Sequence, residues 1–319
     1  MKRSGASPQD AFDDFETILV DTGETSIFAR WAGEGPPVLL LHGFPQTHAM
    51  WRKVAPALSQ QFTVVCADVR GYGQSGCPSS TPDHAPYAKR AMARDMIALM
   101  AELGFRSFSV AGHDRGGRVA YRLALDHPTA IERVVVLDVV PIAEAWDRAD
   151  ARLAVAFWPW SLLAQPEPLP ERLLLAAPDA VIDNAFGGGW GSPREAFDAE
   201  SRDAYLQALR RPESVHAICE EYRAAASIDR QHDADDRQAG RRIQAPLLVL
   251  WSERGPLGTW YADAGGPLGI WRGWAEDVQG QALPGGHFFP EELPDTTIRL
   301  LSAFFGRPAG PPRSPGLSG

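Results

Sequence analysis

The stretch that decides the fold is residues 108–121, which read FSVAGHDRGGRVAY. Its apolar start predicts a strand, its glycine-rich centre a tight turn, and its end a helix. Gly112 and Gly116 stand two residues before and two after Asp114, as in an elbow that exposes a nucleophilic side chain at a strand end. Small residues are expected there because a Cβ would collide with the neighbouring strand and helix. Taken alone, Asp114 is also compatible with a cap at a helix N-terminus.

Short apolar runs on either side of this elbow alternate with helical patterns. This alternation predicts an α/β fold with a mostly parallel sheet that carries helices on both faces. The predicted strands are residues 38–41, 62–67, 108–111, 134–137 and 247–251, and the predicted helices include residues 91–103 and 117–125.

The alternation stops after Asp138 and resumes only near residue 247. Between these points the pattern is helical, with joints rich in proline and glycine. We therefore expect a core built from residues 1–140 and 241–306, a helical cap inserted at residues 141–240, and a disordered tail at residues 307–319.

Two other loops carry groups that suit a nucleophile at residue 114. A turn at His42-Gly43-Phe44 follows a strand, so the backbone N–H groups of Phe44 and Arg115 are predicted to form an oxyanion hole. His287 lies on a glycine-rich loop near the end of the core and is the predicted base. Two carboxylates at strand ends, Asp138 and Glu253, are candidates for the acid that orients it.

Several motifs in order give the chain a family resemblance. It resembles the fluoroacetate and haloacetate dehalogenases of the α/β-hydrolase family over residues 28–305, which implies an α/β-hydrolase core with an inserted helical cap. In that family the acid follows the strand before the cap, which favours Asp138 over Glu253. The motifs are HGFPQTHAMW at residues 42–51, GYG at 71–73, GHDRGGRV at 112–119, VLDVVP at 136–141, CEEYRA at 219–224 and GHFFPEE at 286–292.

An aspartate at position 114 fits the chemistry that this resemblance implies. An ionised carboxylate can displace a leaving group from a saturated carbon and form an ester, whereas attack at an acyl carbon is the task of serine or cysteine. His287 then activates the water that cleaves the ester. Ordinary esterase or lipase activity is excluded because residue 114 is neither serine nor cysteine.

Two arginines beside the elbow indicate the substrate. Arg115 and Arg118 lie three residues apart at the start of the predicted helix, and guanidinium groups bind carboxylates. We expect them to hold the carboxylate of a short 2-haloacid and to keep Asp114 ionised. Arg122, one turn further, fits an exposed surface position better.

The halide pocket departs from the family pattern. The resemblance implies that a histidine, a tryptophan and a tyrosine of the cap hold the leaving halide, and Trp160 and Tyr222 match two of these. The third position is Pro159, which has no side-chain donor. We therefore expect chloro- and bromoacetate to react better than fluoroacetate.

Two alternatives remain. An epoxide hydrolase shares the aspartate and histidine, and Tyr205 and Tyr222 could then protonate the epoxide; Arg115 argues against its apolar substrates. A catalytically inactive binding protein for small acids is opposed by the presence of Asp114, Asp138 and His287 together.

Composition bounds the partners and the compartment. The 319 residues carry a formal charge of −9, the wrong sign for nucleic acid. Three cysteines without metal-ligand spacing, and no apolar stretch long enough to span a membrane, favour the cytoplasm. No metal or organic cofactor is expected; the predicted partners are a haloacid and the halide ion, and a homodimer is left open.

Overall fold

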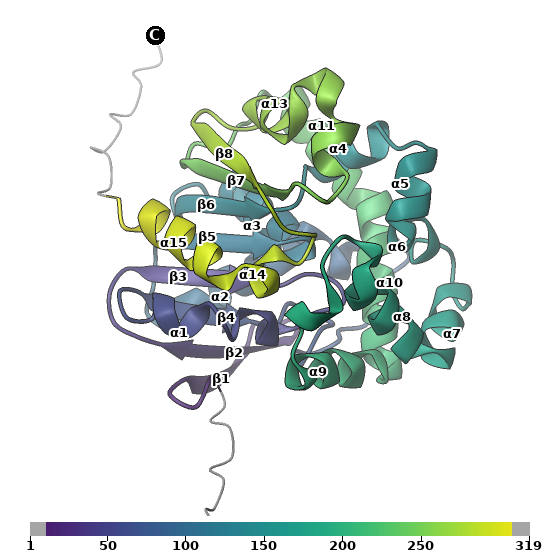
Figure 1. Cartoon of the computed structure of the whole chain (residues 1–319), viewed down its shortest axis with the longest axis horizontal. Helices are drawn as coiled ribbons and strands as arrows, with labels where there is room; N and C mark the ends of the chain where they lie inside the picture. The colour runs from purple at the N-terminus through teal and green to yellow at the C-terminus, as the bar shows by residue number, and fades with distance from the viewer. Residues whose placement is uncertain (1–10, 308–319) are drawn as a thin grey trace, which may run out of the picture.

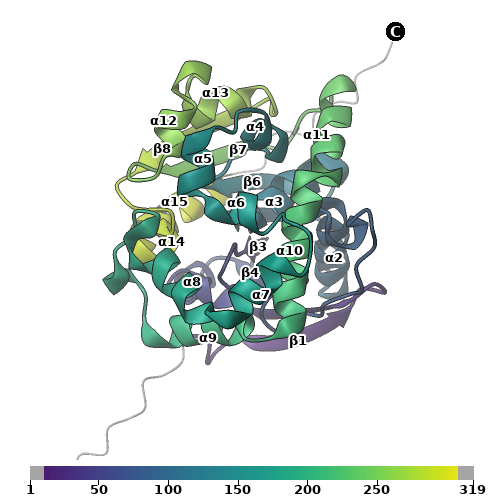
Figure 2. The ribbon, with the colours of Figure 1, turned by 90° about the vertical axis from the view of Figure 1, so that its right-hand side faces the viewer.

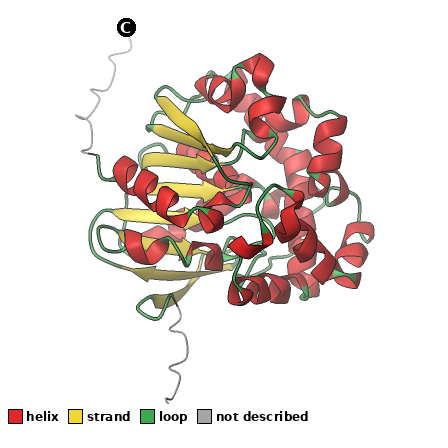
Figure 3. Ribbon diagram, viewed as in Figure 1, coloured by secondary structure: helices red, strands yellow, loops and turns green. Residues whose placement is uncertain are grey.

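The computed structural model describes residues 11–307 and contains one eight-stranded sheet in the order β1-β2-β4-β3-β5-β6-β7-β8. β1 and β2 pair antiparallel with each other, β2 pairs antiparallel with β4, and the other neighbours are parallel. Figures 1 and 3 show the strands stacked side by side through the molecule. The strands are β1 Glu16–Asp21, β2 Ser26–Ala32, β3 Pro37–Leu41, β4 Thr63–Ala67, β5 Phe108–His113, β6 Ile131–Leu137, β7 Leu247–Ser252 and β8 Val278–Leu283.

The five predicted strands are confirmed as β3 to β7, with small shifts of their ends. They were recognisable because the central strands β4 and β5 are buried along their whole length and are therefore mainly apolar. The sequence prediction missed β1, β2 and β8. β1 and β8 are the two edge strands and have mostly exposed or half-buried residues, so their sequences lack a continuous apolar run.

Helices cover both faces of the sheet. α2 and α3 lie behind the sheet in the view of Figure 1, while α1 and α15 lie in front of it. The two helices predicted from the sequence are confirmed as α2 and α3. The helices of the core are α1 Ala55–Leu58, α2 Lys89–Glu102, α3 Arg115–Asp126, α12 Leu257–Trp260, α13 Gly266–Arg272, α14 Phe289–Glu292 and α15 Pro294–Phe305.

Eight α-helices fill the chain between β6 and β7, and they gather beyond one end of the sheet strands (Figure 1). Figure 2 looks directly onto this helical region, which we call the cap. Beyond Arg307, the predicted tail lies outside the described residues. The cap helices are α4 Ile142–Asp147, α5 Ala151–Ala156, α6 Trp158–Leu162, α7 Leu169–Ala176, α8 Pro178–Asn184, α9 Ala199–Leu209, α10 Pro212–Ala226 and α11 Ile228–Gln238.

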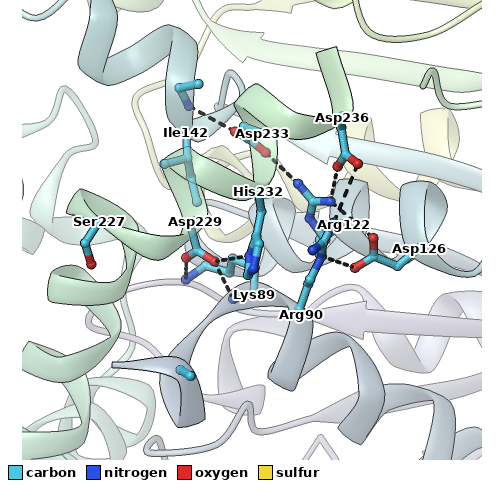
Figure 4. A network of polar contacts seen from close by, with 12 residues as sticks. Lys89, Arg90, Arg122, Asp126, Ile142, Ser227, Asp229, His232, Asp233 and Asp236 are labelled. Carbon is cyan, nitrogen blue, oxygen red and sulfur yellow. Dashed lines mark hydrogen bonds and ion pairs between the residues drawn. The ribbon is translucent and has the colours of Figure 1, made fainter. Parts of the chain in front are cut away.

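Buried ion pairs join α11 of the cap to the core, as Figure 4 shows. Arg122 on α3 donates to Asp233 at 2.6 Å and also pairs with Asp236, both on α11. The backbone N–H of Lys89, the first residue of α2, donates to the Asp229 carboxylate at 2.8 Å. The expectation of a surface position for Arg122 is therefore wrong: the cap covers this side of α3, and the residue is only 1% exposed.

None of the helices among residues 11–307 combines the length and the apolar character that a membrane span needs.

Candidate active site

The elbow at Asp114 forms between β5 and α3 as the sequence predicts. Asp114 has a φ of 45°, a left-handed conformation that costs energy for a residue with a side chain. A Cβ at Gly112 would lie 2.2 Å from the Gly116 carbonyl oxygen, and one at Gly116 would lie 2.4 Å from the His42 carbonyl oxygen. These clashes confirm why both flanking positions must be glycine.

The two carboxylate oxygens of Asp114 have different surroundings. Oδ1 accepts a hydrogen bond of 3.1 Å from the backbone N–H of Phe44, the predicted oxyanion-hole donor after β3. Oδ2 lies 4.0 Å from Nε2 of His287. Arg115, whose N–H is the second predicted donor, directly follows Asp114 as the first residue of α3. One oxygen is thus held while the other faces the space beside the histidine.

His287 is oriented by Asp138, which follows β6. Its Nδ1 lies 2.6 Å from Oδ2 of Asp138, while Oδ1 of the same carboxylate accepts from the backbone N–H of Ser252 at 2.9 Å. Asp138 is 3% exposed, whereas Glu253, the other candidate acid, is an exposed residue. The structure therefore brings Asp114, His287 and Asp138 together.

Charge keeps Asp114 ionised despite its burial. Burial by itself would raise the pKa of this carboxyl, but His287, Arg118 and Arg115 lower it to about 2. At neutral pH Asp114 is therefore a carboxylate, the form in which it can act as a nucleophile.

A small cavity of about 20 Å³ lies next to these groups, enough for roughly one water molecule. Its wall combines the three catalytic candidates with one arginine and a set of apolar and aromatic side chains. The lining residues are Asp114, Arg118, Asp138, Val139, Val140, Ala145, Leu153, Phe157, Trp160, Leu257, Trp260, Tyr261 and His287. So small a space suits a short substrate.

The two arginines, which the sequence treats alike, differ in the structure. Arg118 lines the cavity, and its Nε has no hydrogen-bond partner among the described residues. Arg115 instead donates from Nε and Nη2 to Glu221 of α10, with the Nε bond at 2.8 Å, and only its Nη1 is left without a partner in residues 11–307. Lys89 pairs with the same carboxylate. Glu221 thus occupies most of the hydrogen-bond donors of Arg115.

The predicted halide residues are also placed differently from one another. Trp160 lines the cavity, and its ring lies under the Arg118 guanidinium, 4.5 Å from the guanidinium carbon to the ring centroid. The Tyr222 ring packs against the Arg115 guanidinium at 4.1 Å, and Tyr222 is not among the residues that line the cavity. Pro159 is buried in the first turn of α6.

The sequence analysis did not identify the apolar wall. Phe157 packs edge-on against Trp260, with ring centroids 5.2 Å apart, and also against the His287 ring at 5.8 Å. Tyr261 directly follows Trp260, the last residue of α12. Two adjacent aromatic residues shortly after a strand are the only signal that the sequence offers, and they equally suit core packing.

A possible metal site is remote from this cavity. In residues 11–307, Glu167, Glu171 and His216 bring their ligand atoms within 4.8 Å of one another, and none of them lines the cavity. Arg223 pairs with Glu171 at 2.7 Å and disfavours a second cation there.

Comparisons with known proteins agree with this fold. The family model for the alpha/beta hydrolase fold matches residues 36–180. A fluoroacetate dehalogenase from Burkholderia sp. is 41% identical, over 92% of this chain and 94% of that protein. A soluble epoxide hydrolase from Corynebacterium sp. (strain C12) is 32% identical, over 86% and 91% of the two chains.

Solved structures of similar proteins have the same fold. A protein from Nostoc sp. PCC 7120, described as an alpha/beta hydrolase, superposes with a TM-score of 0.88 at 45% identity and covers 92% of this chain and 98% of its own. A Pseudomonas aeruginosa mutant protein with bound MFA, described as an epoxide hydrolase, gives 0.85 at 44% identity over 92% and 96% of the two chains. These findings confirm the resemblance: the chain is a hydrolase of the α/β-hydrolase family, on the branch that includes the Burkholderia fluoroacetate dehalogenase.

Proposed function

We propose that this protein cleaves the carbon–halogen bond of short 2-haloacids, with haloacetates as the model substrates and glycolate and halide as products. The observation that carries the proposal is the Asp114 carboxylate, ionised in a small cavity beside His287 and Arg118. The 41% identity to a fluoroacetate dehalogenase supports the same reaction.

The first step forms an ester. Oδ2 of Asp114 attacks the carbon that bears the halogen, the carbon–halogen bond breaks, and the halide leaves with the bonding electrons. Arg118 holds the substrate carboxylate, and the unpartnered Nη1 of Arg115 supports it. Binding the carboxylate next to the nucleophile places the neighbouring carbon within reach of Oδ2.

The second step hydrolyses that ester. His287, oriented by Asp138, removes a proton from water, and the resulting hydroxide attacks the carboxyl carbon of Asp114. The N–H groups of Phe44 and Arg115 stabilise the negative oxygen of the intermediate. Collapse releases glycolate and restores Asp114, so that one water is consumed for each halide and proton released.

The preferred halide follows from the donors around the leaving group. Trp160 and Tyr222 retain an N–H and an O–H, but Pro159 offers no side-chain donor. A hydrogen bond to an ion contributes about 1.5–3 kcal/mol, which corresponds to roughly tenfold to a hundredfold in rate. Fluoride, the poorest leaving halide, depends most on such donors, so we expect chloro- and bromoacetate to be preferred.

Epoxide hydrolysis is the alternative, favoured by the 32% identical soluble epoxide hydrolase. It would need two tyrosine O–H groups aimed at the substrate. Tyr205, one of the two candidates, instead donates its O–H to Glu291 at 3.1 Å and does not line the cavity, which leaves Tyr222 without a second tyrosine beside it. The arginine in the cavity also suits an anion better than an apolar epoxide.

Halide release from fluoro-, chloro- and bromoacetate, with styrene oxide given to the same preparation, tests the proposal. We expect chloride and bromide release to exceed fluoride release, with no diol formed. In a His287→Asn variant, chloroacetate should leave a carboxymethyl ester on Asp114, detectable by mass spectrometry of the Asp114 peptide. Diol formation without halide release would instead establish the epoxide hydrolase.

A further inference from the structure

A chain of buried polar side chains runs from the cap to the backbone of His287. The Tyr205 hydroxyl donates to Oε1 of Glu291 at 3.1 Å, and Oε2 of Glu291 lies 2.5 Å from the atom placed as Nε2 of Gln46. The other end of that amide is 3.1 Å from Nδ1 of His113, whose Nε2 lies 2.8 Å from the His287 carbonyl oxygen. All five residues are buried, and none of these contacts takes part in the reaction proposed above.

The direction of the hydrogen bonds is fixed from the His287 end. A backbone carbonyl oxygen only accepts, so Nε2 of His113 must carry a hydrogen. The histidine is neutral, because burial, with the nearby His287, lowers its pKa to about 3. Nδ1 of a neutral imidazole that is protonated at Nε2 carries a lone pair and can only accept.

This lone pair determines how the Gln46 amide must face. A carboxamide fills the same space in either orientation, and only its NH2 end can donate to Nδ1 of His113. The amide is therefore turned from the orientation in which Nε2 faces Glu291 and Oε1 faces His113, and its carbonyl oxygen then faces Oε2 of Glu291. Two acceptors cannot bond to each other, so Glu291 must supply the hydrogen.

The charges around Glu291 agree with a neutral carboxyl group. Lys53 points its ammonium at the carbonyl oxygens of Ala196 and Glu291, not at the carboxyl, and Arg52 pairs with Asp198 and Glu200. Burial raises the pKa of Glu291 to about 8, and Asp198 adds a smaller upward contribution. Tyr205, Lys53 and the Gln46 NH2 group lower it, and turning the amide removes the contribution of Gln46. At neutral pH the group is therefore protonated.

We propose that Glu291 is a positioning residue that works in its protonated form and, through Gln46 and His113, holds the backbone of the catalytic histidine. If Glu291 ionises, its carboxylate attracts the NH2 end of Gln46, and the amide carbonyl turns toward Nδ1 of His113. His113 must then move its hydrogen to Nδ1 and lose the bond to the His287 carbonyl. Alkaline pH thereby loosens the loop that carries the base.

The kinetic test rests on the proposed dehalogenase function and uses Glu291→Gln, which is permanently neutral and can make the same two hydrogen bonds. For wild type, kcat with chloroacetate should fall about tenfold per pH unit above 8. Glu291→Gln should keep its neutral-pH kcat to higher pH, with little change in KM. Glu195→Gln, at an exposed position of the cap, is the matched control and should follow the wild type.

A second readout does not depend on activity. Infrared spectra of the wild type should contain the carbonyl band of a protonated carboxyl group at pH 7, where Asp233, with a pKa of about 6, is mostly ionised. This band should disappear above pH 8, and Glu291→Gln should lack it. Superimposable alkaline limbs for wild type and Glu291→Gln, or the absence of this band from the wild type, would overturn the proposal. If no haloacid is hydrolysed, or the variant does not fold, the wild-type band still decides the state of Glu291.

Discussion

Substituting Arg118 and Arg115 one at a time by methionine separates two residues that look equivalent in the sequence. Arg118 lines the cavity with its Nε unpartnered among the described residues, whereas Arg115 is bound to Glu221. We therefore expect Arg118→Met to impair substrate binding and Arg115→Met to impair folding stability. Methionine keeps most of the side-chain volume and so limits cavity effects.

The loss for Arg118→Met follows from the hydrogen bonds to the substrate carboxylate. A bond to a charged group contributes about 1.5–3 kcal/mol, so kcat/KM for chloroacetate should fall by roughly 10- to 150-fold, mainly through KM. Within the described protein Arg118 makes one long hydrogen bond, 3.5 Å to the Asp114 carbonyl oxygen, and packs on the Trp160 ring, a contact that methionine can largely keep, so Tm should change little.

Arg115→Met leaves the buried Glu221 carboxylate with Lys89 as its remaining cation. Removing one member of a buried ion pair costs about 3–5 kcal/mol, which should appear as a clear fall in Tm. Halide release against chloroacetate concentration and thermal unfolding are measured on both variants, with Arg230→Met on the exposed side of α11 as the control. An unchanged KM for Arg118→Met, together with a raised KM and unchanged Tm for Arg115→Met, would refute this assignment.

Three further outcomes are expected. Pro159→His should raise fluoride release relative to chloride release by roughly tenfold or more, measured by ion-selective electrode on matched acetates, because it restores a donor in the cap; an unchanged ratio would place the halide elsewhere. Folding raises the pKa of Glu291 from 4.5 to about 8. The contribution of Glu291 to the free energy of unfolding is therefore complete below pH 4.5 and is lost as the pH rises toward 8, by about 1.4 kcal/mol per pH unit. Denaturant unfolding at pH 5 and pH 8 should show this loss in the wild type and not in Glu291→Gln. Arg122→Met should lower the unfolding free energy by about 3–5 kcal/mol, because Asp233 and Asp236 lose their buried cation, whereas Arg230→Met should not.

The central strands of the sheet could be predicted because strands that are buried on both faces have mainly apolar sequences. Residues 38–41 are a continuous apolar run and residues 108–111 are apolar except for Ser109, and these segments form β3 and β5. The edge strands could not be found in this way, because an edge strand such as β8 mixes buried and exposed positions and contains polar residues.

In the candidate site, too, some residues could be predicted from local sequence and others could not. Asp114, Asp138 and His287 stand on loops at strand ends, where a short motif specifies the backbone, so their convergence could be foreseen. The ion pairing and burial of Arg115 and Arg122 depend on Glu221 and Asp236, which lie more than a hundred residues away in the sequence. These carboxylates come close only because the cap folds onto α3. No local pattern contains that information.

The attachment of the cap to the core limits how molecules enter and leave. Two buried ion pairs hold the cap on the core, Arg115 with Glu221 and Arg122 with Asp236. If the cap moved away from the core as a lid, both pairs would have to separate and become hydrated. Substrate entry and product release under a fixed cap depend on rotations of side chains at the narrowest points. The packed rings of Phe157 and Trp260 lie in the wall of the cavity. Because these ion pairs hold the cap rigidly, the way into the cavity stays narrow, and molecules are selected by size before they can react.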